Sequence, residues 1–101
     1  MSNFIPIPHL VGEPLTKAQL SALTGETLAE LDTAVRNGAP VTRTGGVRSP
    51  LIFDSAQFFA WVQISEAERL GGPQFAKIAR LEIERDALML ALEKSRGTGK
   101  E

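Results

Sequence analysis

The stretch of sequence that decides the fold runs from Thr16 to Val62 and reads TKAQLSALTGETLAELDTAVRNGAPVTRTGGVRSPLIFDSAQFFAWV. Two helix-forming runs in its first half are separated at Gly25, where a tight turn can use the positive φ that glycine adopts without steric cost. A glycine-rich segment, 44–49, then separates two short apolar runs, and another helix-forming run follows. The stretch therefore predicts a helix, a turn, a second helix, a β-hairpin and a third helix, in that order.

Two capping boxes mark the starts of the first two helices. In a capping box, a Ser or Thr side chain and a Glu or Gln side chain three positions later each satisfy a free backbone N–H of the first turn. Thr16 with Gln19 forms the first box, and Thr27 with Glu30 forms the second. The predicted helices span 16–23 and 27–36, and the side chains expected to face the core are Leu15, Leu20, Leu23, Leu28, Leu31 and Val35.

The hairpin is predicted from two short strands, 41–43 and 50–53, on either side of the glycine-rich loop. Pro50 fits an edge strand, because proline cannot donate to the ladder of hydrogen bonds. Arg43 and Arg48 flank the loop with no acidic residue between them. They are therefore the cations best placed to bind an anionic partner.

A third helix and a long fourth helix complete the chain. Asp54 is the predicted N-cap of the third helix, with Gln57 at the N3 position, and Trp61 is interpreted as a core anchor rather than a base-stacking residue. Gly71-Gly72-Pro73 predicts a break in the chain. Residues 74–96 then predict a helix about 34 Å long at 1.5 Å per residue.

The last helix carries an apolar stripe at heptad a and d spacing, which Arg85 interrupts. So small a domain offers too little surface to bury this stripe, so we expect a helical hairpin or coiled-coil contact with another chain. The alternative is that the helix folds back on its own domain. The predicted oligomerisation residues are Phe75, Ile78, Leu81, Leu88 and Leu92. The predicted organisation is an arm (1–14), a domain (15–70), an oligomerisation helix (74–96) and a flexible tail (97–101).

Composition excludes several classes of protein. The chain has no Cys and one His, so neither a disulfide framework nor a structural zinc site is expected. It contains no P-loop motif, and a Ser/His/Asp set cannot be argued from a lone His9 in the arm, so we expect neither an enzyme nor a cofactor. No signal peptide and no apolar run of about 18 residues is present, which predicts a cytoplasmic protein.

A helix-turn-helix followed by a hairpin is the layout of a winged helix-turn-helix DNA-binding domain, similar to that of MerR-like regulators and excisionases. The predicted fold class is therefore mainly α with a small β-hairpin and a long C-terminal helix. Because the formal net charge is −1, DNA contact would have to come from a local cluster of cations. The candidate DNA-binding residues are Lys17, Thr27, Thr33, Arg36, Asn37, Arg43 and Arg48.

Four segments carry a resemblance to a known family: LSALTG at 20–25, NGAPV at 37–41, RTGG at 43–46 and FDSAQFFAW at 53–61. Together they resemble the N-terminal domain of the lambda-type small subunit of phage terminase, over about residues 15–90. The resemblance implies a protein that recognises the packaging site on viral DNA, recruits the large-subunit motor in the host cytoplasm, and assembles as a dimer or ring. It also implies that 27–37 is the recognition helix and 43–48 the wing.

The charge of the second helix departs from that family. Glu26, Glu30 and Asp32 lie where the family has basic or small polar residues, and Ala34-Val35 lies where it has a Trp. Acidic side chains weaken docking against phosphates. Two interpretations remain: the wing and Lys17 bind DNA with the help of avidity, or the domain mainly assembles the packaging machine. An excisionase- or MerR-like regulator without a motor partner, and a pure protein-interaction adaptor, are the alternative functions.

Overall fold

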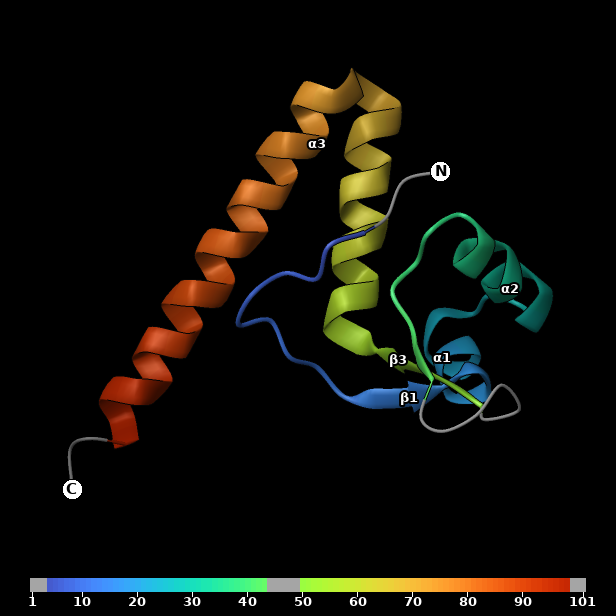
Figure 1. Cartoon of the computed structure of the whole chain (residues 1–101), viewed down its shortest axis with the longest axis horizontal. Coiled ribbons are helices and arrows are strands. Elements are labelled where there is room, and N and C mark those ends of the chain that lie inside the picture. Colours follow the sequence, from blue (N-terminus) through green and yellow to red (C-terminus); the bar gives the residue numbers. More distant parts are fainter. Residues whose placement is uncertain (1–3, 44–49, 99–101) are drawn as a thin grey trace.

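The chain builds a mainly helical fold with a small antiparallel sheet and a long C-terminal helix (Figure 1). The computed structural model describes residues 4–43 and 50–98, and side chains as far as Thr42 and from Pro50 to Arg96. The predicted loop with Arg48, and residues 99–101 of the predicted tail, lie outside the described residues. The elements are β1 (Pro14–Thr16), α1 (Lys17–Thr24), α2 (Leu28–Arg36), β2 (Thr42–Arg43), β3 (Leu51–Asp54) and α3 (Ser55–Thr98).

Both predicted capping boxes are confirmed. The Thr16 hydroxyl accepts a hydrogen bond from the Gln19 backbone N–H at 3.2 Å, and the Gln19 side chain accepts one from the Thr16 N–H at 2.9 Å. Thr27 and Glu30 exchange the same pair of bonds at 3.1 and 2.8 Å. Gly25 ends α1 in the left-handed region, with φ of 83°, as the turn between two close helices requires.

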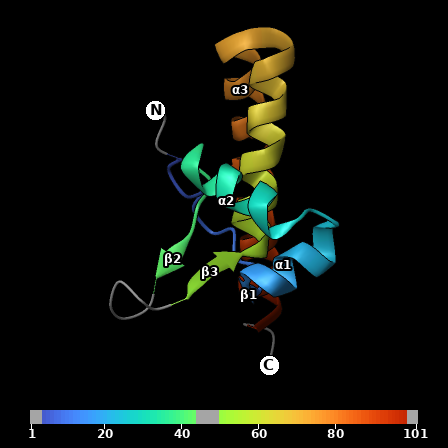
Figure 2. The same ribbon diagram turned by 90° about the vertical axis from the view of Figure 1, so that its right-hand side faces the viewer.

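The sheet has a third strand that the sequence analysis missed. The strand order is β1-β3-β2, with both pairs antiparallel, and the strands lie side by side beneath α2 in the view of Figure 2. Leu15 of β1 lies opposite Phe53 of β3, and the last residue of the predicted arm, Pro14, begins this strand. Placing Pro50 on an edge strand was also wrong, because β3 is the central strand. Pro50 is tolerated since it lies one residue before β3 and has no ladder bond to donate.

A core of large apolar side chains joins the two short helices to β3 and the start of α3. Leu20, Leu31, Phe53 and Phe58 are buried, and the Phe53 and Phe58 rings meet edge to face at 5.9 Å. Trp61 packs against this cluster, which confirms its interpretation as an anchor.

Two side chains predicted to face this core are exposed instead. Leu23 is 59% exposed and Leu28 is 48% exposed. Both lie at helix ends on either side of Gly25, where the chain turns away from the sheet. The helical period predicted that both side chains would be buried. It was wrong because the period does not show how far the neighbouring elements extend along a helix.

Helix α3 is bent at the predicted Gly71-Gly72-Pro73 break, and its two halves diverge like the arms of a V (Figure 1). Gly72 has φ of 80° and ψ of −171°, a combination that only glycine adopts without strain. A Cβ on Gly72 would touch nothing within 4 Å, so the requirement is conformational and not one of space. We call 55–71 the first leg of α3 and 73–98 the second leg.

The N-terminal arm passes between the two legs and packs against both (Figure 1). Ile7, only 2% exposed, lies in one cluster with Ala60 of the first leg and Ala87 of the second. Arg80 of the second leg lies over the Phe4 ring, 5.6 Å from its centroid. The alternative, in which the last helix folds back on its own chain, holds in part, because one face of the second leg is covered by the chain's own arm. A contact of the second leg with another chain stays a prediction.

Gln57 fixes the arm by a set of buried hydrogen bonds. Its side-chain oxygen accepts from the Ile7 N–H at 2.8 Å, and its amide nitrogen donates to the Ile7 carbonyl at 2.9 Å and the Leu10 carbonyl at 2.6 Å. Asp54 is the N-cap of α3 as predicted, since it accepts from the Gln57 N–H at 3.0 Å. Gln57 lies at N3 as predicted, and its side chain binds the arm.

The substitution Gln57→Leu is expected to lower the free energy of unfolding by about 2–4 kcal/mol. It keeps the apolar bulk but leaves the buried Ile7 N–H and the partly buried Leu10 carbonyl without this partner, at about 1–3 kcal/mol for each unsatisfied group. The Ile7 carbonyl keeps a bond from the Leu10 N–H. The matched control is Gln63→Leu on the exposed side of the same leg, which should change the stability by less than about 0.5 kcal/mol. Urea unfolding measures both variants, and equal stability of the two would contradict the role of Gln57.

Candidate nucleic-acid interface

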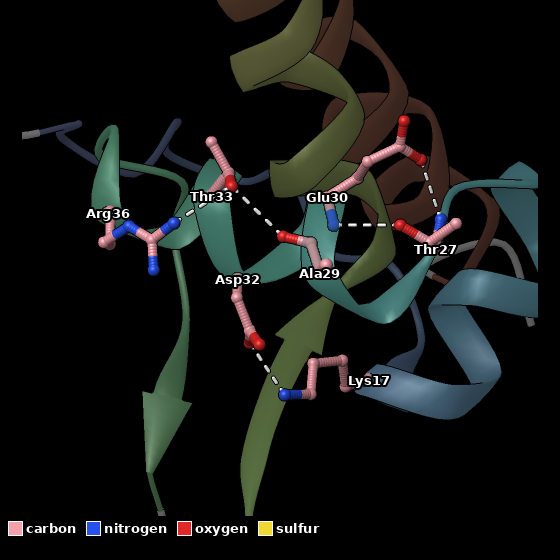
Figure 3. A network of polar contacts seen from close by, with 7 residues as sticks. All are labelled: Lys17, Thr27, Ala29, Glu30, Asp32, Thr33 and Arg36. Atoms are coloured by element: carbon pink, nitrogen blue, oxygen red, sulfur yellow. Dashed lines mark hydrogen bonds and ion pairs between the residues drawn. The ribbon is translucent and has the colours of Figure 1, made fainter.

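The candidate DNA-binding residues at the C-terminal end of α2 are exposed, but Thr33 and Arg36 are hydrogen-bonded within the chain (Figure 3). The Arg36 guanidinium donates to the Thr33 hydroxyl at 3.1 Å, and that hydroxyl donates to the Ala29 carbonyl at 3.1 Å. Asn37 follows directly as the C-cap of α2 and is exposed. Thr33, Arg36 and Asn37 are therefore brought together at the C-terminal end of the helix.

Lys17 and Thr27 lie apart from that group and serve other purposes. Lys17 Nζ pairs with Asp32 Oδ1 at 2.7 Å and so ties the start of α1 to α2 (Figure 3). The pair is partly exposed, so its effect on stability is modest, but it cancels the charge that Lys17 would offer to a phosphate. Thr27 uses its hydroxyl to cap α2.

The segment predicted to be the wing is described only in part. Arg43 lies in β2, with its Cα opposite that of Leu51, while its side chain lies outside the described residues, as does the whole of Arg48. Strand β2 begins at Thr42, a few residues after α2 ends at Arg36. Gly38, with φ of 108°, lies in the turn between them. The predicted order of two short helices followed by two antiparallel strands is thus present in the described part of the chain.

A groove between α2 and the first leg of α3 was not predicted. It has a volume of about 360 Å³, and it is lined by Ala34, Phe58, Trp61 and Val62 and rimmed by polar residues that include Glu26, Glu30, Glu66 and Arg69. The sequence showed acids at 26 and 30 on the outward face of α2, but nothing in it placed that face against the first leg.

Glu66 and Arg69 form an ion pair along one rim of this groove. The hydrogen bond from Arg69 lowers the pKa of the Glu66 carboxyl below its usual value, and the same bond raises the pKa of Arg69. Both side chains are more than half exposed, so the pair sets local charge and has little effect on stability.

The predicted oligomerisation residues lie on the second leg and are exposed. The exposed fractions are 54% for Phe75, Ile78, Leu81 and Leu92 and 44% for Leu88, and Met89 and Leu90 are exposed beside them. We call these seven residues the apolar face of the second leg. The arm covers a different side of the same helix, around Arg80, Ile83 and Ala87. One large apolar surface therefore remains uncovered within the described chain.

The comparisons with known proteins leave these sites to be interpreted from their geometry. Comparison with protein-family models found no match, and neither did comparison with curated proteins or with solved structures. Within residues 4–43 and 50–98, no group of His, Asp and Glu side chains is arranged to hold a metal ion. No helix in those ranges combines the length and the apolar character needed to cross a membrane.

A pair of substitutions separates the capping role of Thr27 from contact with DNA. Thr27→Ala removes the cap and should cost about 1 kcal/mol of stability, whereas Thr27→Ser keeps a capping hydroxyl and should cost only a few tenths. Thermal unfolding monitored by circular dichroism measures both. If Thr27→Ser binds DNA more weakly than the parent at unchanged stability, then the Thr27 methyl group contacts DNA and capping is not its only role.

Proposed function

We propose that this chain is the small subunit of a phage terminase of the lambda type, which binds viral DNA through a winged helix-turn-helix domain and recruits the large-subunit motor in the host cytoplasm. The observation that carries the proposal is the order of elements: two capped helices joined at Gly25, followed directly by the β2–β3 hairpin. That order supports the proposal, because winged DNA-binding domains have a recognition helix followed by a wing.

The structure favours the wing over α2 as the main point of DNA contact. Lys17 is paired with Asp32, and Glu26 and Glu30 are exposed at the start of α2. A phosphate near these carboxylates would meet like charge, and binding to DNA depends on cations that replace condensed counterions. Arg43 and Arg48 flank the hairpin loop, and Arg36 lies at the end of α2 that leads into it.

A single chain offers few cations for DNA, so in this proposal self-association raises the affinity for DNA. The apolar face of the second leg offers a surface typical of a helix–helix contact between copies. Several wings on one assembly bind one DNA duplex with a high effective concentration, so weak individual contacts add up.

The double substitution Arg43→Ala/Arg48→Ala is expected to weaken binding to duplex DNA by about tenfold or more at low salt. It should also reduce the slope of log affinity against log salt concentration by about one for each arginine removed per subunit. The matched control, Arg69→Ala/Lys94→Ala, removes the same charge from exposed positions of α3 outside the hairpin and the apolar face, and should bind like the parent. Gel shift with a packaging-site duplex and a random duplex measures all three proteins, and a parent that shifts neither duplex would refute DNA binding.

The substitution Leu81→Glu/Leu88→Glu is expected to convert the assembly into monomers. Two carboxylates would have to be buried in the contact, while the fold should persist because both side chains are about half exposed in the single chain. Ala22→Glu/Gln63→Glu adds the same charge at exposed positions elsewhere and is the control. Sedimentation velocity gives the masses. A parent that is monomeric at every concentration, or a variant that assembles like the parent, would contradict this use of the second leg.

A further inference from the structure

The groove between α2 and the first leg of α3 has an apolar floor that the chain leaves partly uncovered. Phe58 lines the groove and belongs to the core, while Trp61 is half-buried and Val62 is 39% exposed. A volume of about 360 Å³ is enough for one large apolar side chain with part of the backbone that carries it.

The charges around this floor select the kind of partner. Glu26 and Glu30 reach the groove from α2, and Glu66 reaches it from the first leg. Arg69 is also on the rim, but it is already paired with Glu66. Three carboxylates and one cation thus leave the groove with an excess of negative charge, which repels nucleic acid and attracts a basic segment.

Glu30 is held in place by the same bonds that cap α2. Its side chain accepts a hydrogen bond from the Thr27 N–H at 2.8 Å, which orients the carboxylate before any partner arrives. A fixed carboxylate loses little conformational freedom on binding, so an ion pair with it forms at a lower entropic cost.

We propose that this groove binds a basic segment of another protein, with a leucine-sized side chain packed on Trp61 and Val62 and with Lys or Arg side chains paired to Glu26, Glu30 and Glu66. This inference goes beyond the proposed function, because neither DNA binding through the wing nor self-association through the second leg uses the groove. It also gives a role to the acidic surface of α2, which DNA binding leaves unexplained.

Trp61 makes the test direct, because it is the only Trp in the chain and lies in the groove. The probe is the peptide RKLLKR, acetylated and amidated at its ends, titrated at low salt while tryptophan emission is followed. The expected result is a saturable shift of emission to shorter wavelength as water leaves the indole. The peptide RKSSKR, which lacks the apolar anchor, and EELLEE, which reverses the charge, should each cause no saturable change.

Charge variants show whether the groove itself is the site. Glu26→Gln/Glu30→Gln/Glu66→Gln should weaken binding about tenfold, as expected for three partly exposed ion pairs. The α2 cap survives because Gln also serves at N3 of a capping box. Glu13→Gln/Glu82→Gln/Glu93→Gln removes the same charge elsewhere and should weaken binding less than about twofold. Val62→Ser should weaken binding at unchanged net charge.

Several outcomes would overturn the inference. One is a parent protein whose emission does not change with RKLLKR, and another is equal binding of RKSSKR. Equal weakening by the two triple variants would show that total charge, and not the groove, attracts the peptide. An emission shift that follows protein concentration without peptide would assign the groove to a second copy of the chain. An emission shift produced by a DNA duplex would assign it to nucleic acid. Each of these results is distinguishable from a failure of DNA binding, which is measured without the peptide.

Discussion

The buried carboxamide of Gln57 is the interaction on which the rest of the structure depends. It joins the first leg of α3 to the arm by hydrogen bonds to Ile7 and Leu10. Ile7 lies 50 positions before Gln57 in the sequence. The arm in turn places Ile7 between the legs, so the bend at Gly72 is held from inside. Asp54 strengthens this junction by capping α3 while accepting from the Gly12 N–H at 3.0 Å. A chain this small cannot build a large core, and a fully satisfied polar junction joins its two small apolar clusters.

This arrangement separates three surfaces that have different chemistry. Strand β2 with Arg43 lies at one edge of the sheet, on another side of the chain from the second leg (Figures 1 and 2). The groove with its carboxylates lies between α2 and the first leg, and the apolar face lies on the second leg. Because the arm fixes the second leg, the apolar face is presented at a defined direction relative to the hairpin. In the proposed function, assembly through the second leg therefore sets the spacing of the wings along DNA, while the groove stays free for a basic protein segment.

Local features were predictable from the sequence, and contacts between distant residues were not. The capping boxes at Thr16 and Thr27, the turn at Gly25 and the bend at Gly72 depend on residues within a few positions of one another. Strand β1 was missed because its partner β3 lies far along the chain, and a three-residue strand has no periodicity of its own. Lys17 was expected to face DNA, because the sequence does not show that Asp32 of the next helix lies beside it. The groove was missed for the same reason: it exists only where two helices meet.

Distances between the two legs test most directly whether the arm holds the molecule as one body. The chain has no Cys, so Gln63→Cys/Glu93→Cys places one spin label on each leg and nowhere else. Measured by pulsed electron resonance, with excess unlabelled protein to remove distances between copies, the parent should give one narrow distribution. Adding Ile7→Asp, which puts a charge between the legs, should broaden the distribution and shift its mean. A distribution that is already broad in the parent, or one that Ile7→Asp leaves unchanged, would contradict the account.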